Sequence, residues 1–516
     1  MLSWRQSRPN ARTCPKSAAT CHKRGHPPNE RRDRNAAPLA SATQTADSLT
    51  LMETNKSYFF VGVGGSGMMP LAMILAGRGA SVSGSDRSLD AGRVPAKFDA
   101  LQSRGIHLFP QDGSGITSAD QVVIASAAVE DSVPDMVKAR DVGATHMTRP
   151  ELLSRLFNES AHRIGVAGTS GKSTVTGMIG WIFSQAGRDP TVMNGAVMKN
   201  FATPDAPFAS ALVGEGDTFI SEVDESDGSI ALYNPTIAVL NNVSLDHKSL
   251  EELRALFGDF VGRASASVIN IGDPESAAIA SRLDRETVMT FAVDRAANLT
   301  ARNLKPEPFG IAFDLHIAGQ FRQTVRLSVP GRHNVENALA ALAAAFASSI
   351  IPPVAIPAIE GFTGLKRRFE RVGEANGITV IDDFGHNPEK IAATLDTLHA
   401  FPGRLLLMFQ PHGYGPLKVM RRELVTMFVS RLKKGDQLVL PDPVYQGGTV
   451  AREVTSADIV AELTPAGIDA RHIPDRDAAA AHLVASAKPG DRIVIMGARD
   501  DTLSLLAQRM LDDLNR

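Results

Sequence analysis

The chain has 516 residues, enough for about three domains of ordinary size, and 43% of them are apolar. This composition excludes a disordered or fibrous protein, and no apolar run is long enough to cross a bilayer. The formal charge of -2 lacks the basic excess of a dedicated nucleic-acid binder, and the two cysteines, Cys14 and Cys21, are too few for a disulfide scaffold or a cysteine-built zinc site.

The first segment of the chain differs in composition from the rest. Residues 1–50 contain nine Lys/Arg and three Asp/Glu, a net charge of +6, so the remainder of the chain is acidic. They show neither apolar periodicity nor the apolar segment of a secretory signal. We expect residues 1–55 to form a disordered basic tail. A mitochondrial-type presequence, a nucleic-acid arm and a start codon assigned upstream of Met52 are alternatives for this segment.

From Lys56 onward, short apolar runs alternate with longer helical patterns, which is typical of βαβ units and a parallel sheet. The first alternation predicts strands at 58–63, 81–84 and 121–125, helices at 68–78 and 93–105, and a short helix at 150–156. The second predicts strands at 163–167, 219–222, 237–241 and 267–271, and helices at 172–186 and 334–348. The third predicts strands at 379–382, 405–409, 437–441 and 492–496.

These three alternations predict an α/β protein with three domains. Residues 56–159 would form a Rossmann-like N-terminal domain, and residues 160–362 a central domain with a P-loop ATPase-like parallel sheet. Residues 363–516 would form a Rossmann-like C-terminal domain.

The first glycine-rich loop follows a predicted strand and opens a predicted helix, as a dinucleotide-binding loop does. It contains Gly62, Gly64, Gly65, Ser66 and Gly67. Its glycines allow the backbone to approach an anion, and the helix N-terminus supplies N–H donors. Asp86, near the end of the next strand, stands where a ribose-binding acid would be. The loop therefore indicates either NAD or another nucleotide diphosphate, and a tight turn that only packs helix on strand is the alternative.

The second loop resembles a phosphate-binding loop more specifically. Residues 168–174 read Gly-Thr-Ser-Gly-Lys-Ser-Thr between a strand and a helix, although Val166 occupies the place of the usual first glycine. The backbone N–H groups suit phosphates, Lys172 suits the β- and γ-phosphates, and the Ser173 hydroxyl suits Mg²⁺. A kinase, an ATPase or a ligase would each use such a loop.

Acidic and imidazole side chains follow the next strands of the central domain. Glu222, Asp224, Glu225 and Asp227 stand at the end of one predicted strand, and residues 241–247, Asn-Asn-Val-Ser-Leu-Asp-His, stand at the end of another. Parallel neighbouring strands would bring these groups to the same sheet edge as the phosphate loop. We therefore predict metal ligation there, with a polar loop and a surface histidine as the alternative for residues 246 and 247.

At this point the sequence resembles the Mur ligase family over residues 56 to 510. Within the family it resembles the branch of UDP-N-acetylmuramate–L-alanine ligases and murein tripeptide recycling ligases. The matching segments are residues 62–68, 168–173, 222–227, 246–247, 331–337, 367–370, 382–388 and 409–412.

The resemblance implies a role for each matching residue. Lys172, Glu222 and His247 would be catalytic, and Ser173, Glu222 and His247 would hold magnesium. The first glycine loop and Asp86 would bind the UDP-linked substrate, and His386 and His412 would contact the amine. ATP would be bound by Gly168, Thr169, Ser170, Gly171, Lys172, Ser173, Thr174, His333, Asn334, Asn337, Arg368 and Asp383.

The resemblance also implies a reaction. A cytoplasmic ligase of peptidoglycan precursor synthesis would use ATP and Mg²⁺ to join L-alanine to UDP-N-acetylmuramate through an acyl phosphate, releasing ADP and phosphate. No nucleic acid or membrane span would be involved, and the enzyme would be a monomer or homodimer. No protein nucleophile is needed, which agrees with a body that contains no cysteine.

Several positions depart from the pattern of this branch. Ser170 replaces a histidine and Ser173 a threonine in the phosphate loop, and Arg254 stands nearest to the position where several family members carry a modified lysine. Residues 413–418, Gly-Tyr-Gly-Pro-Leu-Lys, replace an arginine-rich pattern suited to a carboxylate. A tripeptide recycling ligase, or a family member with another acid and amine, therefore remains an alternative.

Two alternatives belong to other functional classes. An NAD-dependent oxidoreductase would need the first loop and Asp86, but it leaves Lys172, Glu222 and His247 without a role. A non-catalytic nucleotide-binding regulator would need the phosphate loop without the predicted metal ligands. Phosphate release that depends on both the acid and the amine would distinguish a ligase from either of them.

Overall fold

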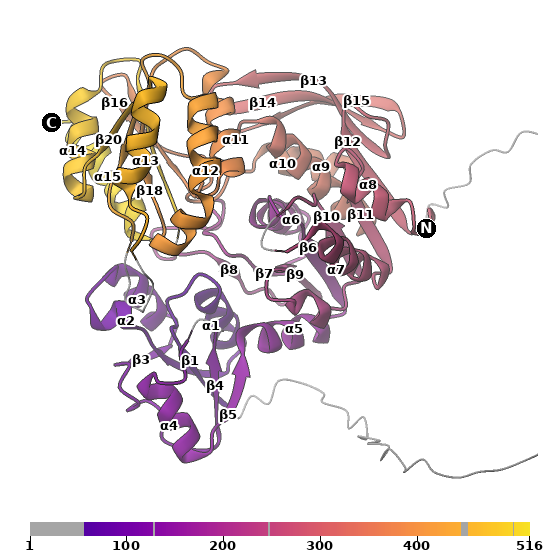
Figure 1. Cartoon of the computed structure of the whole chain (residues 1–516). Helices are drawn as coiled ribbons and strands as arrows, with labels where there is room; N and C mark the ends of the chain where they lie inside the picture. Colours follow the sequence, from indigo (N-terminus) through magenta and orange to yellow (C-terminus); the bar gives the residue numbers. More distant parts are fainter. Residues whose placement is uncertain (1–55, 127–128, 246–247, 445–451, 499) are drawn as a thin grey trace, which may run out of the picture. The chain divides into compact units, whose positions relative to one another are not determined.

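The computed structural model describes residues 56–126, 129–245, 248–444, 452–498 and 500–516. The predictions for residues 1–55 and for His247 therefore fall outside the described residues. Within the described residues the strands form three sheets of five, ten and six strands (Figure 1). No described helix is both long enough and apolar enough to span a bilayer.

The N-terminal sheet has the strand order β3-β2-β1-β4-β5, and all of its neighbouring strands are parallel. Its order changes direction at β1, so the first glycine loop leaves the sheet at the switch point where α/β proteins bind ligands. The elements are β1 (Ser57–Val61), α1 (Met68–Gly77), β2 (Ser81–Ser85), α2 (Arg87–Asp90), α3 (Pro95–Gln102), β3 (His107–Phe109), β4 (Gln121–Ala125), α4 (Pro134–Val142), β5 (Thr145–Thr148) and α5 (Arg149–Glu159).

The central sheet has the order β15-β14-β13-β12-β11-β10-β6-β9-β7-β8, so β6 lies between β9 and β10. These three strands are parallel, and their carboxyl ends therefore meet at one edge. The elements are β6 (His162–Ala167), α6 (Lys172–Gln185), β7 (Thr191–Met193), β8 (Ala211–Leu212), β9 (Thr218–Glu222), η1 (Ser229–Leu232), β10 (Ile237–Leu240), α7 (Leu250–Gly262), β11 (Ala266–Asn270), α8 (Pro274–Ala280), β12 (Val288–Val293), β13 (Leu299–Glu307), β14 (Gly310–Ile317), β15 (Gln320–Leu327), α9 (Arg332–Ala347) and α10 (Pro352–Glu360).

Strands β13 to β15 were missed by the sequence patterns. They form an antiparallel extension of the parallel sheet, with register shifts in both pairings. Strand β15 is exposed over most of its length, so its sequence lacks the apolar run that is typical of a buried strand. A parallel sheet alone therefore describes only part of the central domain.

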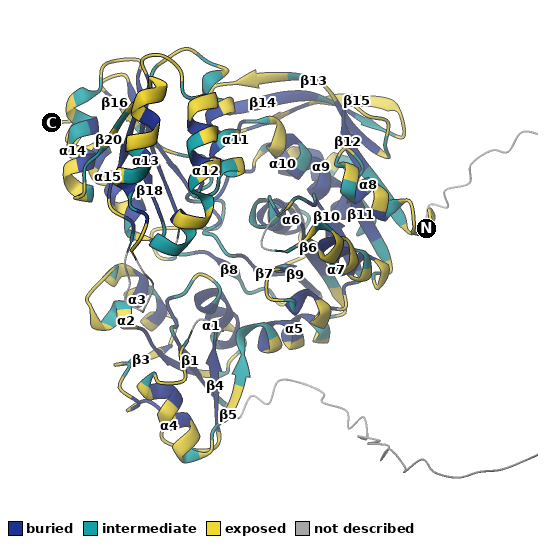
Figure 2. Ribbon diagram, viewed as in Figure 1, coloured by how far each residue is buried: buried dark blue, intermediate teal, exposed yellow. Residues whose placement is uncertain are grey.

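The C-terminal sheet has the order β16-β17-β21-β18-β19-β20, in which β16 alone is antiparallel to its described neighbour. The elements are β16 (Glu370–Ala375), β17 (Ile378–Asp383), α11 (Pro388–His399), β18 (Leu405–Gln410), α12 (Tyr414–Arg431), β19 (Gln437–Leu440), α13 (Ser456–Leu463), η2 (Thr464–Ala466), β20 (Asp469–His472), α14 (Arg476–Ser486), β21 (Arg492–Gly497) and α15 (Thr502–Leu514). Figure 2 shows the inner strands of each sheet buried, whereas edge strands such as β15 and the outer helix faces are exposed.

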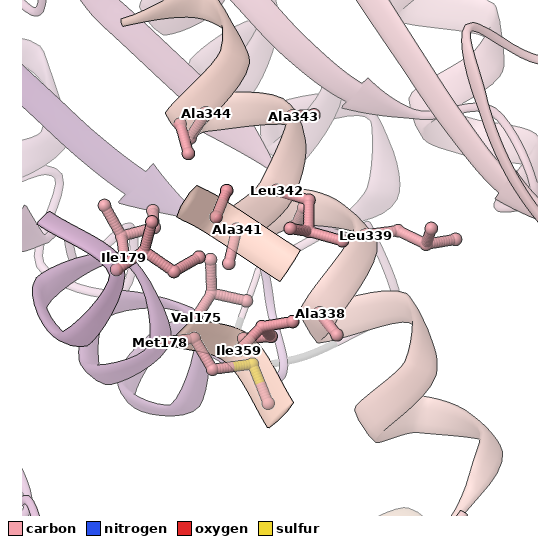
Figure 3. Packing of buried hydrophobic residues seen from close by; sticks show 14 of the residues in the cluster. Val175, Met178, Ile179, Ala338, Leu339, Ala341, Leu342, Ala343, Ala344 and Ile359 are labelled. Carbon is pink, nitrogen blue, oxygen red and sulfur yellow. The ribbon is translucent and has the colours of Figure 1, made fainter. Parts of the chain in front are cut away.

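The core of the central domain packs α6 against the alanine-rich helix α9. Val175, Met178 and Ile179 of α6 are fully buried, as are the residues from Ala338 to Ala345 of α9 (Figure 3). Methyl side chains allow two helices to approach closely, and this buried apolar surface is the main stabilising contribution of the pair. The packing also brings the first residues of α6 and α9, which carry predicted site residues, to the same end of the domain, where the side chain of Asn337 meets that of Asn241.

Candidate active site

The second glycine loop connects β6 to α6 and is shaped by two glycines with positive φ. Gly168 has φ +135 and Gly171 has φ +84. A Cβ atom on Gly171 would lie 2.5 Å from both Asn241 Nδ2 and Asn337 Oδ1, so the loop is packed closely against β10 and α9. These contacts require glycine at this position for both conformational and steric reasons. The local geometry agrees with a phosphate-binding loop even though Val166 replaces the usual first glycine.

Lys172 is the first residue of α6, and its ammonium group lies between the loop and a carboxylate. Its Nζ donates to Gly168 O at 2.8 Å and to Glu225 Oε2 at 2.8 Å. Burial lowers the pKa of Lys172, but Glu225, Asp224 and Glu222 outweigh burial and leave this pKa above its ordinary value. The lysine is therefore a fixed positive charge at the predicted phosphate site.

Ser173 and Glu222 lie in direct contact, which is compatible with their predicted role as ligands of one metal ion. The Ser173 hydroxyl donates to Glu222 Oε2 at 2.7 Å, which joins the phosphate loop to the end of β9. A hydroxyl and a carboxylate are hard oxygen ligands, and Mg²⁺ commonly uses one or two such protein groups together with substrate phosphates and water. No group of three or more His, Cys, Asp or Glu residues suited to a metal occurs in the described ranges. Ser173 and Glu222 thus fit a magnesium ion that is held partly by nucleotide.

The side chains of Asn241 and Asn242 hold the phosphate loop, and the sequence patterns assigned neither of them an individual role. Asn242 Oδ1 accepts from Ser170 N at 2.8 Å and from Thr169 Oγ1 at 2.9 Å. Asn241 Nδ2 donates to Asn337 Oδ1 at 2.9 Å, whereas the buried Asn241 Oδ1 has no partner among the described residues. Such a buried, unpaired acceptor is costly unless a ligand or water supplies a donor. The doubled asparagine after β10 was visible in the sequence, but its contacts depend on the fold.

These groups line a cavity of about 560 Å³ that is formed by residues of the central and C-terminal domains. Its volume lies within the range of small-molecule sites. The cavity brings together most of the predicted ATP-binding residues, namely Thr169, Ser170, Gly171, Lys172, Ser173, Thr174, His333, Asn334, Asn337, Arg368 and Asp383. Gly168 and Glu222 lie one contact behind the lining, through Lys172 and Ser173 respectively. Lining residues that were not predicted include Asn270, Asp273, Glu336, Glu389 and Lys390.

The C-terminal domain presents Arg368 to this cavity through an unusual backbone conformation. The two flanking residues, Arg367 and Phe369, both have positive φ, at 60 and 49 degrees. The Arg367 side chain donates to the backbone oxygens of Gly497 and Asp500, and Phe369 N donates to Asp383 Oδ2 at 2.8 Å. These bonds stabilise a strained segment and leave the Arg368 guanidinium 4.1 Å from the centre of the Phe384 ring.

Asp383 lines the cavity, but much of its carboxylate is already used by the protein. Besides Phe369 N, it accepts from Gly385 N at 2.8 Å and from Thr394 Oγ1 at 3.1 Å. A carboxylate offers about four acceptor positions, so one remains for a ligand. The predicted contact of Asp383 with ATP is compatible with this geometry, and Asp383 also positions the segments on either side of Arg368.

The two histidines predicted for the amine site lie together. The rings of His386 and His412 have centroids 5.2 Å apart in an edge-to-face arrangement. His386 Nδ1 lies 2.9 Å from Phe384 O, which can only accept a hydrogen bond, so this nitrogen carries the proton and Nε2 is left as an acceptor. Burial, together with Lys390, lowers the pKa of His386 to about 3. His386 is therefore neutral at any physiological pH.

This shifted pKa predicts how stability depends on pH. The folded-state pKa of His386 lies below the ordinary 6.5, so its contribution is complete above 6.5 and is lost as the pH falls towards 3. Between about pH 7.5 and about pH 5, the wild type should lose about 1–2 kcal/mol more unfolding free energy than His386→Gln. The exposed His107 gives a matched control, because His107→Gln should follow the wild type. If denaturant titration showed the same pH dependence of the unfolding free energy for wild type and His386→Gln, the lowered pKa of His386 would be contradicted.

The first glycine loop is held by Asp86, which also begins helix α2. Asp86 Oδ2 accepts from Gly64 N at 2.9 Å, and Oδ1 accepts from Ser88 N at 2.7 Å. Its carboxylate therefore fixes the loop that it was predicted to assist, with less capacity left for a ribose hydroxyl. Two basic side chains that the sequence patterns missed lie beside the loop. Lys97 Nζ donates to Gly64 O at 3.0 Å, and Arg149 Nη1 lies 3.0 Å from the place that a Cβ atom on Gly67 would occupy. No local motif marks either residue.

Arg254, nearest to the position of the modified lysine, takes part in a different interaction. It lies on α7, and its guanidinium pairs with Glu275 of α8, with Nη2 at 2.7 Å from Oε1. Neither residue lines the cavity. Arg254 therefore does not substitute for a lysine at the phosphate site.

Comparisons with known proteins agree with this arrangement. Three family models match consecutive segments: Mur ligase family, catalytic domain, at residues 57–161; Mur ligase middle domain at 166–345; and Mur ligase, glutamate ligase domain, at 367–499. A UDP-N-acetylmuramate–L-alanine ligase of Streptomyces coelicolor is 34% identical over 473 residues, which cover 89% of this chain and 97% of that protein. One from Rhizobium meliloti is 33% identical over 455 residues, covering 85% and 93%.

Solved structures show the same fold. A UDP-N-acetylmuramate–alanine ligase from Thermotoga maritima has a TM-score of 0.73 at 23% identity, and a murein peptide ligase from Psychrobacter arcticus has 0.67 at 24%. Each comparison covers 89% of this chain and 99% of the other. The predicted α/β fold with three domains is thereby confirmed, whereas the exact domain boundaries stay a prediction.

Proposed function

The chain belongs to the Mur ligase family of ATP-dependent ligases, and from that premise we propose that it joins L-alanine to UDP-N-acetylmuramate. The proposal is supported by relatives with that activity that are 33–34% identical over most of both chains. The observation that carries it is the convergence of Lys172, Ser173 and Glu222 at one end of the cavity with Arg368 and His386 of the C-terminal domain.

The reaction we propose begins with the phosphate loop. The substrate carboxylate attacks the γ-phosphorus of ATP, which forms an acyl phosphate and breaks the bond to ADP. Lys172 would stabilise the negative charge on the transferring phosphoryl oxygens, and the loop N–H groups would hold the phosphates. Mg²⁺, held by Ser173, Glu222 and His247, would supply further charge neutralisation when bound.

The second step forms the amide bond. The amine attacks the acyl carbon, and phosphate leaves from the tetrahedral intermediate. His386 is neutral with Nε2 as an acceptor, so it is suited to accept a hydrogen bond from the free amine and to orient it for attack, whereas its low pKa makes it too weak a base to deprotonate an ammonium group. Arg368, stacked on Phe384, would bind ATP phosphate from the opposite side of the cavity.

The UDP-linked acid would bind at the first glycine loop. Lys97 and Arg149 lie beside this loop, so a diphosphate there would meet two cations as well as the N-terminus of α1. Asp86 would act on this substrate through the loop that it holds. The same geometry supports an NAD-dependent oxidoreductase less well, because that function leaves the cavity around Lys172 without a purpose.

A murein tripeptide recycling ligase is the second candidate. It is favoured by the segment after Gly413, where Lys418 pairs with the exposed Glu453 and no arginine fork suited to an amino acid carboxylate occurs at residues 413–418. The two candidates share the acid substrate and the chemistry and differ in the amine.

Phosphate release tests both candidates. We expect phosphate release from ATP to be at least about 100 times faster with both UDP-N-acetylmuramate and L-alanine than with either omitted, because the acid is needed to form the acyl phosphate and the amine to release phosphate from it. L-alanine should exceed glycine, L-serine and the tripeptide L-alanyl-γ-D-glutamyl-meso-diaminopimelate. If the tripeptide were the only one of these amines to support phosphate release, the second candidate would replace the first. Release without any amine would contradict the ligase.

A further inference from the structure

Lys172 is already paired in this structure, and its partner has no role in the proposed reaction. Glu225 stands three residues after Glu222, in the turn that follows β9, and is only 4% exposed. Its Oε2 accepts from Lys172 Nζ at 2.8 Å. The second bond of the ammonium group goes to Gly168 O, inside the loop itself. A buried carboxylate is thus paired with the cation that the phosphates of ATP would need.

The pairing is specific to Glu225 among the carboxylates nearby. Asp224 accepts from Ser226 N at 2.9 Å, and Glu222 accepts from the Ser173 hydroxyl at 2.7 Å. Both raise the pKa of Lys172 through their charge, yet neither forms a hydrogen bond with it in the described structure. The contact between Lys172 and Glu225 can therefore be separated by mutation from the general negative charge of this strand end.

Carboxylate and phosphate oxygens compete for the same donor. An ammonium ion has three N–H donors, and one is used by Gly168 O. Strong charge-assisted bonds to two phosphate oxygens, from the β- and γ-phosphates of ATP or from the terminal β-phosphate of ADP, would use the other two, which requires Lys172 to leave Glu225. Because Glu225 is buried, its interaction with the lysine is weakly screened by water, so the exchange opposes nucleotide binding.

We propose that Glu225 is the resting counter-ion of Lys172, a positioning residue that nucleotide phosphate displaces on binding. The inference rests on the proposed function, which puts ATP at the phosphate loop. In the free enzyme Glu225 keeps the lysine extended along the loop and balances its charge. In the cycle it lowers the affinity for ADP and thereby assists product release.

The test is calorimetric titration of the full chain with ADP in the presence of a chelator, so that metal does not contribute. Glu225→Gln keeps an oxygen that can accept from Lys172 but removes the charge. We expect ADP to bind Glu225→Gln at least about tenfold more tightly than the wild type, and ADP inhibition of turnover to strengthen by a similar factor. A glutamate that served only the fold would have the opposite effect, since its loss would weaken ADP binding.

Asp224→Asn is the matched control, because it removes a neighbouring charge without touching the lysine contact. Its ADP affinity should stay within about threefold of the wild type, a difference of well under 1 kcal/mol. Equal tightening in both variants would overturn the proposal, since charge alone would then explain it, and so would an unchanged or weaker affinity in Glu225→Gln. If that variant does not fold, Glu225→Asp replaces it, because the shorter carboxylate retracts from Lys172 and should tighten ADP binding by about threefold.

ADP binding by Lys172→Met shows whether a negative result contradicts the role of Glu225 or the phosphate-loop assignment itself. If Lys172→Met binds ADP as tightly as the wild type, the nucleotide does not use this lysine, and the phosphate-loop assignment itself is wrong. If Lys172→Met weakens ADP binding while Glu225→Gln does not tighten it, the site stands and the role of Glu225 is wrong.

Discussion

Lys172→Met is expected to lower ATP-dependent phosphate release by about 100- to 1000-fold. The side chain supplies the fixed cation at the phosphate loop, and its raised pKa keeps it charged over the working pH range. Groups that stabilise charge in a transition state are each worth about 100- to 1000-fold in rate. Methionine keeps most of the length and the apolar stem of lysine, so the loss should come from the missing charge. The measurement is initial phosphate release with saturating acid and amine.

Lys172→Met should also lower stability, and a control variant must separate this effect from the loss of activity. Without the ammonium group, Glu225 becomes a buried carboxylate with no cation in contact, which costs about 3–5 kcal/mol when one partner of a buried pair is removed. The double variant Lys172→Met/Glu225→Gln should recover most of the lost thermal midpoint and none of the activity. Recovery of activity in the double variant, or retained activity in the single one, would show that Lys172 does not act on the phosphates.

The phosphate loop was predictable from sequence because its chemistry is local. A glycine turn, a lysine and a hydroxyl in consecutive positions between a strand and a helix specify one backbone geometry, which the structure shows at Gly168 to Ser173. The position of Glu222 at the same sheet edge as the phosphate loop was also predicted, because carboxyl ends of parallel neighbours meet at one edge. The predicted roles of these residues in binding ATP and metal remain predictions.

Other parts of the site could not be predicted because they depend on which strands become neighbours. Sequence order does not reveal that β6 lies between β9 and β10, and this order brings Glu225 to Lys172 and Asn242 to Ser170. The left-handed backbone on both sides of Arg368 could not be predicted from the sequence either, because Arg367 and Phe369 are not residue types that favour positive φ. Bonds from distant segments stabilise this conformation in the folded chain.

For Asp86 the sequence predicted the position correctly but gave an incomplete role, that of a ribose-binding acid. Its place after β2 matched that of a ribose-binding acid, yet its oxygens accept from Gly64 N and Ser88 N. The bond from Ser88 N is a local helix cap and the bond from Gly64 N joins the first glycine loop to the next strand, and a spacing rule counts neither of them. Sequence spacing therefore placed Asp86 correctly beside the first glycine loop but did not predict that its carboxylate holds that loop.

Gly195→Ala is expected to lower turnover by about 100-fold while leaving the fold intact. Gly195 follows β7 and lies against Glu222, and a Cβ atom there would overlap the carboxylate oxygen Oε1. That oxygen is at the end of a flexible side chain, so Glu222 rather than the backbone should move, and its contact with Ser173 should break. A misplacement of about 1 Å at a reacting site can cost about 100-fold in rate. The readout is kcat for phosphate release together with the thermal midpoint.

The backbone at Gly195 does not require glycine, which is why activity and stability should separate. Its φ is not positive, so alanine can adopt the native conformation and should change stability by less than about 1 kcal/mol. Gly258→Ala in α7 is the matched control, because nothing lies within 4 Å of the added methyl group there, and full activity is expected. Raising Mg²⁺ should partly restore Gly195→Ala if Glu222 is a ligand, since mass action compensates for weaker binding. Normal activity in Gly195→Ala would mean that the position of Glu222 does not matter to the reaction.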